Sequence, residues 1–138
     1  MPYQTHKRAF DVCSDDAMAA VEEIIQLGFR RLLTSGQRET AEAGVELIGL
    51  LQRRFGDRIV IMAGAGVTER NALSIVSASG VSEIHGSASE ERASRLNTIR
   101  MGSGPEVGRK RVTNSDLVQR IVQSISGHAP ISCQHQTK

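Results

Sequence analysis

A fourfold alternation of short apolar runs with segments of helical periodicity is the feature of this sequence that most constrains its fold. The runs occupy residues 7–12, 30–34, 58–63 and 81–85, and after them apolar residues recur with the i, i+3, i+4 spacing of amphipathic helices. Such alternation predicts parallel strands joined by helices. We therefore predict an α/β fold of the TIM-barrel type with four consecutive β/α units, since a complete barrel takes ~250 residues.

Capping residues predict where the helices begin and end. Ser14, Thr68 and Thr113 each precede helical spacing and are predicted to cap the first, third and fourth helices. Gly28 and Gly80 are predicted to end the first and third helices, because glycine readily adopts the left-handed conformation found after many helices.

These signals predict one domain followed by a tail. We expect residues 1–126 to form the β/α domain and residues 127–138 to be a disordered tail. Residues 87–112 break the pattern, which predicts a long functional or mobile loop. The third helix is expected to bury three apolar side chains, those of Ala72, Leu73 and Val76.

Composition argues against several classes of protein. The 17 Lys and Arg residues nearly balance the 15 Asp and Glu, and only 3% of residues are aromatic, so nucleic-acid binding is not favoured. No apolar run approaches the roughly 20 residues of a membrane span, and the polar N-terminus does not resemble a signal peptide. Cys13 and Cys133 lie far apart, which favours reduced thiols. We expect a cytosolic protein without a nucleic-acid or membrane partner.

Residues able to bind or react stand at the predicted carboxyl ends of all four strands, where parallel α/β folds bind their ligands. They are Arg8 and Asp11, then Thr34 and Ser35, then Gly64 and Gly66, and finally His85, Gly86 and Ser87. The two glycines of the third end precede a helix, which indicates a backbone site for an anion; a tight turn is the alternative.

The side chains at these ends each allow a functional and a structural interpretation. His85 fits a general acid or base, a metal ligand, or a buried structural histidine. Arg8 fits an anion clamp, with Asp11 orienting it or accepting a proton; an internal ion pair is the alternative. Thr34 and Ser35 offer hydroxyl groups for binding.

Segments at the four strand ends resemble the motifs of the CutC copper-homeostasis family in order and spacing. They are residues 8–11, 33–36, 59–67 and 83–88, and the resemblance covers residues 5 to about 125. It implies a cytosolic, usually oligomeric TIM-barrel protein that binds copper as Cu(I). It also implies a pocket at the strand carboxyl ends, lined by Arg8, Asp11, Thr34, Ser35, Gly64, Gly66, His85, Gly86 and Ser87.

The sequence departs from that family in three ways. Lys7 stands where family members tend to have a histidine, and Ala65 occupies the middle of a loop that is commonly three glycines, a change expected to be mild. The third departure is the lack of segments resembling the family's N-terminal half, with its cysteines. Cys13 is the remaining candidate for a copper ligand, and a small, partly buried residue is the alternative.

Three functions follow as hypotheses. The first is a copper-homeostasis protein of the CutC kind that binds copper and has an anion-binding pocket. The second is a TIM-barrel enzyme or enzyme remnant acting on a phosphorylated or carboxylated metabolite, and the third is a truncated form without activity. Because four strands leave two sheet edges unpaired, we also expect a homo-oligomer, with a homodimer that closes two halves into a barrel as one form.

Overall fold

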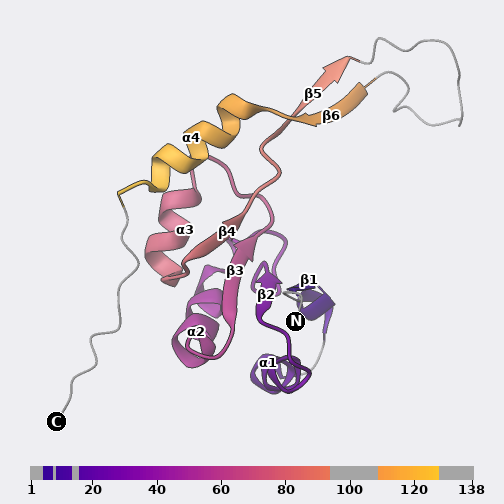
Figure 1. The fold of residues 1–138 in the computed structure, drawn as a ribbon, viewed down its shortest axis with the longest axis vertical. Coiled ribbons are helices and arrows are strands. Elements are labelled where there is room, and N and C mark those ends of the chain that lie inside the picture. Colours follow the sequence, from indigo (N-terminus) through magenta and orange to yellow (C-terminus); the bar gives the residue numbers. More distant parts are fainter. Residues whose placement is uncertain (1–4, 8, 14–15, 94–108, 128–138) are drawn as a thin grey trace, which may run out of the picture.

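Four parallel strands form the central sheet of the protein, seen in a computed structural model (Figure 1). The strands are adjacent in the order β1-β2-β3-β4, which is also their order in the chain. The described residues are 5–7, 9–13, 16–93 and 109–127. A parallel sheet with interleaved helices confirms the predicted α/β class, while closure as a TIM-type barrel stays a prediction.

The elements follow one another as in the predicted pattern, with a hairpin added before the last helix. They are β1 (Thr5–Lys7), the 3-10 helix η1 (Ala9–Val12), α1 (Ala17–Gln26), β2 (Arg31–Thr34), α2 (Val45–Phe55), β3 (Val60–Gly64), α3 (Ala72–Ser79), β4 (Glu83–His85), β5 (Ser89–Ala93), β6 (Arg109–Thr113) and α4 (Ser115–Ile125).

The two faces of the sheet differ in burial, because successive side chains of a strand point to opposite sides. Leu32 and Ile61 are level in β2 and β3, and both are completely buried. Their neighbours Leu33 and Met62 are also level, yet only half-buried. The buried face packs on α1, α2 and α3 through a core that includes Val21, Ile24, Ile48, Leu51, Phe55, Ala72 and Ile75. The opposite face is only partly covered in the described part of the chain.

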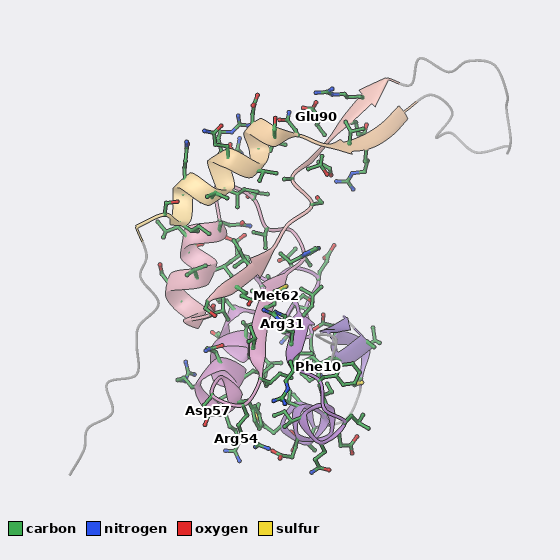
Figure 2. The ribbon with its side chains drawn as sticks, in the orientation of Figure 1. Phe10, Arg31, Arg54, Asp57, Met62 and Glu90 are labelled. Carbon is green, nitrogen blue, oxygen red and sulfur yellow. The ribbon has the colours of Figure 1, made fainter. Side chains whose placement is uncertain are left out.

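An ion pair crosses that partly covered face. Arg31 of β2 donates from Nε to Glu83 Oε2 at 3.0 Å and from Nη2 to Oε1 at 2.9 Å, so the two side chains span the intervening β3 near Met62 (Figure 2). The side chains are 29% and 31% exposed, so water screens the pair and its contribution to stability is modest. Its geometry fixes β4 relative to β2.

The first strand lies earlier than predicted. Residues 7–12 were expected to be extended, but β1 ends at Lys7 and a 3-10 helix, η1, follows it. The reason is that Phe10 turns inward and is fully buried, while the Asp11 carboxylate turns toward the end of β2. An extended chain would place these adjacent side chains on opposite faces.

The helix caps are partly as predicted. Gly28 follows α1 with φ +85° and Gly80 follows α3 with φ +73°, as expected for glycines that end helices. Ser14 lies outside the described residues, and Asp16 caps α1 by accepting from the Met18 N–H at 3.0 Å.

Two other predicted caps are wrong. Thr113 belongs to β6, and its neighbour Asn114 caps α4 by accepting from two backbone N–H groups. Thr68 lies four residues before α3, and its own N–H donates to Asn71 Oδ1.

The inward face of α3 also differs from the prediction in one position. Ala72 is buried and Val76 is half-buried, as expected, but Leu73 is 41% exposed. Ile75 is buried in its place, because residues 72, 75 and 76 share the face that packs on the core.

The predicted loop over residues 87–112 contains regular structure at both ends. Strands β5 and β6 pair antiparallel from Ser89↔Thr113 to Ala93↔Arg109, and the hairpin extends away from the rest of the molecule (Figure 1). Residues 94–108 and the predicted tail after Gly127 lie outside the described residues. No helix among the described residues is long and apolar enough to cross a membrane.

Candidate functional site

The loops at the carboxyl ends of β1 and β2 are held together by the carboxylate of Asp11. Its Oδ1 accepts from Thr34 Oγ1 at 2.5 Å and from the Gln37 N–H at 3.1 Å, and its Oδ2 accepts from the Ser35 N–H at 2.9 Å. Thr34 and Ser35 are completely buried. The structure therefore brings three predicted site residues together, through bonds that they make with one another.

The two hydroxyl groups at this end are engaged within the loop that follows β2. Thr34 Oγ1 accepts from the Gly36 N–H at 2.9 Å, and Ser35 Oγ donates to the Arg38 carbonyl at 2.6 Å. A Cβ at Gly36, where φ is +70°, would lie 2.2 Å from the Gly44 carbonyl oxygen. These contacts give Asp11, Thr34 and Ser35 a structural role in holding the loop.

A cavity of about 720 Å³ lies at the carboxyl ends of β3 and β4, the other two strands of the sheet. We call it the β3–β4 pocket. Its lining comes from Leu33 of β2, the ends of β3 and β4, the loop before α3, the hairpin and α4. The lining residues are Leu33, Ala65, Gly66, Val67, Thr68, Glu69, Arg70, His85, Ser87, Ala88, Ser89, Arg111, Leu117 and Ile121.

Basic side chains outnumber acidic ones in this pocket. Arg70, His85 and Arg111 line it together with a single carboxylate, that of Glu69. Glu69 is already engaged, since it accepts from Arg120 Nε. Within this lining, arginine side chains therefore outnumber carboxylates.

Asn71 organises the pocket wall between β3 and α3. Its Oδ1 accepts from the Thr68 N–H at 2.8 Å, and its Nδ2 donates to the Gly66 carbonyl at 3.0 Å and to Glu42 Oε2 at 3.1 Å. Sequence reasoning missed this residue. The available signal was an asparagine three residues after Thr68, a spacing at which side-chain to backbone bonds shape turns.

The turn after β3 is more strained than predicted. Ala65 adopts φ +90°, a conformation that a residue with a Cβ rarely takes, while Gly66 beside it has φ +67°. The alanine in this loop is therefore not a mild change. Its carbonyl is held by the Ala41 N–H at 3.0 Å.

Gly64 has a different reason to be glycine. A Cβ there would lie 2.6 Å from Leu33 Cδ1 and 3.3 Å from His85 Cβ. Gly64 and His85 are level in β3 and β4, so the missing side chain leaves room for Leu33 and lets β4 lie close beside it at His85.

The predicted site residues thus fall into separate groups. Gly66, His85 and Ser87 line the β3–β4 pocket, whereas Asp11, Thr34 and Ser35 bond to one another at the other end. Gly86 lines a second hollow of about 420 Å³ between α3, β4 and α4, which we call the α4 groove. Arg8 lies outside the described residues. Sequence reasoning missed Thr68 as a lining residue, together with Arg70, Ser89 and Arg111.

The described residues do not fit a metal site with three or more protein ligands. No group of three His, Cys, Asp or Glu side chains suited to a metal ion occurs among them. Cys13 is exposed, and its thiol donates to the Ala9 carbonyl at 3.4 Å. His85 belongs to the pocket at the other end of the sheet.

Comparison with known proteins gives one consistent family. The model of the CutC family matches residues 3–90. CutC family proteins from Bacteroides thetaiotaomicron and Bacteroides fragilis are 39% and 40% identical over 127 and 128 residues, which is 88% of this chain and 51% of each relative. The chain therefore spans about half the length of the curated relatives it matches.

A solved structure agrees with these matches. The crystal structure of CutC from Streptococcus agalactiae superposes with a TM-score of 0.55 at 32% identity, covering 59% of this chain and 40% of that one.

Proposed function

The chain belongs to the CutC copper-homeostasis family, and from this premise we propose that it binds a small anionic ligand, phosphorylated or carboxylated, in the β3–β4 pocket. The observation that carries the proposal is the lining of that pocket by Arg70, His85 and Arg111 with only the engaged Glu69 opposing them. Guanidinium groups bind phosphate and carboxylate through charge-assisted hydrogen bonds, and Arg70 and Arg111 bring two of them to the lining of this cavity.

The size and polarity of the pocket fit an organic anion. A volume of about 720 Å³ lies within the range of small-molecule sites. Leu33, Val67 and Leu117 offer apolar surface for a carbon skeleton, while Ser87 and Thr68 add hydroxyl groups near the basic side chains. The combination favours a ligand with a carbon framework and at least one phosphate or carboxylate group.

Copper binding would require ligands that the described residues do not bring together. Cu(I) prefers thiolate and thioether ligands, and Cys13 is a single exposed thiol at the far end of the sheet from the pocket. We therefore propose anion binding, and not copper binding, for the described residues. We expect equal Cu(I) affinity for the wild-type chain and Cys13→Ser in a competitive titration with a chelator.

The direct test is calorimetric titration with matched pairs of compounds. Glycerol 3-phosphate against glycerol, and citrate against a neutral polyol of similar size, separate the effect of the anionic group from that of the carbon skeleton. We expect heat of binding and a raised melting temperature for at least one phosphorylated or carboxylated compound. The neutral compounds should give neither. Equal responses within every pair, or none from a broad panel of such anions, would contradict the proposal.

A further inference from the structure

The β3–β4 pocket and the α4 groove adjoin each other. Ala88 and Ile121 line both hollows. The Ala88 carbonyl accepts from the Asn114 N–H at 2.8 Å, which holds the segment after β4 against the start of α4. Ile121 lies one helical turn after Leu117, which lines the pocket, and one turn before Ile125, which lines the groove. The two hollows therefore meet beside α4.

Strand β4 separates the two hollows until it ends. His85 lines the pocket, whereas its neighbour Ile84 lines the groove, because successive side chains of a strand point to opposite sides. Beyond the strand, Ala88 belongs to both linings. A ligand in the pocket can therefore extend into the groove past the carboxyl end of β4.

The linings of the two hollows differ in chemistry. Arg70 and Arg111 line the pocket, whereas the lining of the groove that the structure describes contains no basic side chain. Its polar side chains are Ser82 and Glu83, and Glu83 is engaged, since both of its oxygens accept from Arg31. Alanine, glycine, valine and isoleucine make up the rest of the groove. The pocket therefore suits a charged group and the groove suits an apolar one.

The groove offers apolar surface that a ligand can bury. Val118 and Val122 of α4 are 41% and 52% exposed, and Val76 and Ile84 across the groove are half-buried. The lining of α4 runs from residue 118 to residue 125, which is about 10 Å along the helix axis. Burial of one methylene group strengthens binding by up to about fourfold. A hydrocarbon chain of several carbons fits these dimensions.

We propose that the ligand is an amphiphilic anion, with its phosphate or carboxylate group in the β3–β4 pocket and a hydrocarbon chain in the α4 groove. Chain binding in the groove rests on the anion binding proposed above, and it specifies the carbon skeleton of that ligand as an alkyl or acyl chain. The occupant of the groove is part of the same ligand because the two hollows are continuous at Ala88 and Ile121.

Two homologous series of compounds test this proposal by calorimetric titration. They are methyl, butyl and octyl phosphate, and acetate, butanoate and octanoate, each used below the concentration at which micelles form. We expect affinity to rise about tenfold from the butyl to the octyl member of at least one series, because the open groove buries the chain only in part. Octanol, which has the chain without the charge, should bind much more weakly.

The outcomes separate chain binding from anion binding. Equal affinities for the butyl and octyl members would overturn chain binding in the groove and leave the anion site in place. Octanol that binds as tightly as octyl phosphate or octanoate would also overturn the proposal, because the anionic group would then contribute nothing. Failure of every member of both series to bind would contradict the anion site itself.

A pair of variants places the chain in the groove. Val122→Asn changes a residue that lines the groove and not the pocket, whereas Val12→Asn makes the same exchange at a side chain that is 85% exposed and lines neither hollow. The gain in affinity from butyl to octyl should fall to about threefold or less in Val122→Asn and stay about tenfold in Val12→Asn. An unchanged gain in a folded Val122→Asn would overturn this placement.

Methyl NMR spectra of the wild-type chain test the same placement without a substitution, and they decide if Val122→Asn does not fold. The octyl compound should shift the methyl signals of Ile84, Val118 and Val122, and the butyl compound should shift them much less. Equal shifts of these three residues with both compounds would overturn the proposal.

Discussion

Polar residues lie near the carboxyl ends of both pairs of strands, β1–β2 and β3–β4, but their surroundings differ. At the β1–β2 end, Asp11, Thr34 and the neighbouring backbone N–H groups bond to one another and hold a loop. At the β3–β4 end, Arg70 and His85 line a cavity with basic side chains in excess. The difference teaches that a polar residue at a strand carboxyl end is well placed for a ligand, but its role depends on whether the fold itself already satisfies it.

The largest effect we expect is on stability, from Asp11→Ala. The substitution leaves the buried Thr34 hydroxyl and two backbone N–H groups without their carboxylate, and bonds to a charged group contribute about 1.5–3 kcal/mol each. We expect the free energy of unfolding to fall by about 3 kcal/mol in urea denaturation. Asp57→Ala removes a carboxylate from an exposed turn and should change the free energy of unfolding by less than ~0.5 kcal/mol. Equal losses of stability in the two variants would contradict the structural role of Asp11.

The next effect is on ligand affinity, from Arg70→Ala. Loss of one guanidinium from the β3–β4 pocket should weaken binding of the best anion about tenfold, equivalent to ~1.4 kcal/mol. Arg38→Ala removes the same charge from the loop after β2 and should leave the affinity unchanged, because Arg38 is exposed and is not among the residues that line the β3–β4 pocket. Isothermal titration of both variants measures this. An equal loss in both would show a general charge effect instead of a site.

A smaller effect is expected at the strained turn. Ala65→Gly should raise the free energy of unfolding by about 1 kcal/mol, because glycine adopts φ +90° without the steric cost that a Cβ imposes. Thermal and urea unfolding both measure this gain in stability. Ala43→Gly, in the exposed turn before α2, is the control and should not gain stability. A loss of stability in Ala65→Gly would show that the turn is unstrained.

The smallest effect concerns the hairpin that brings Ser89 and Arg111 to the pocket. Hydrogen bonds from Asn114 and then Arg92 lower the pKa of Glu90 below its ordinary value of 4.5. A lowered pKa in the folded state gives stability that is present above pH 4.5 and is lost as the pH falls through the lowered value. The melting temperatures of the wild-type chain and Glu90→Gln should therefore differ slightly at pH 7 and converge in acid. A difference in melting temperature that stays the same at all pH values would contradict a stabilising role of the Glu90 carboxylate.

The parallel sheet could be predicted from sequence, because strand and helix periodicities differ and repeat four times along the chain. The ends of the elements could not. The first strand was placed too late, since nothing in residues 7–12 shows that Phe10 would be buried by a 3-10 turn. Asn114 and Asp16 replaced the predicted caps because neighbouring polar residues compete for the same backbone N–H groups.

Three of the residues predicted at strand ends, Gly66, His85 and Ser87, line the β3–β4 pocket because they lie at or just beyond the ends of β3 and β4. Their role in ligand binding stays a prediction. Arg70 and Arg111 were missed, since Arg111 comes from a hairpin in a segment predicted as loop and Arg70 lies beyond the strand end. Bonds such as those of Asp11 depend on loop geometry, which sequence spacing does not encode.

The most direct test of the difference between the β1–β2 and β3–β4 ends is a titration followed by amide NMR spectra, because amides at both ends are observed in one experiment. The titrant is the anion that binds best in calorimetry. We predict saturable shifts at the amides of Gly66, Thr68 and Ser87, with the amides of Ser35 and Gln37 nearly unchanged. Saturable shifts at Ser35 and Gln37 with none at Gly66 and Ser87 would contradict the assignment of ligand binding to the β3–β4 end.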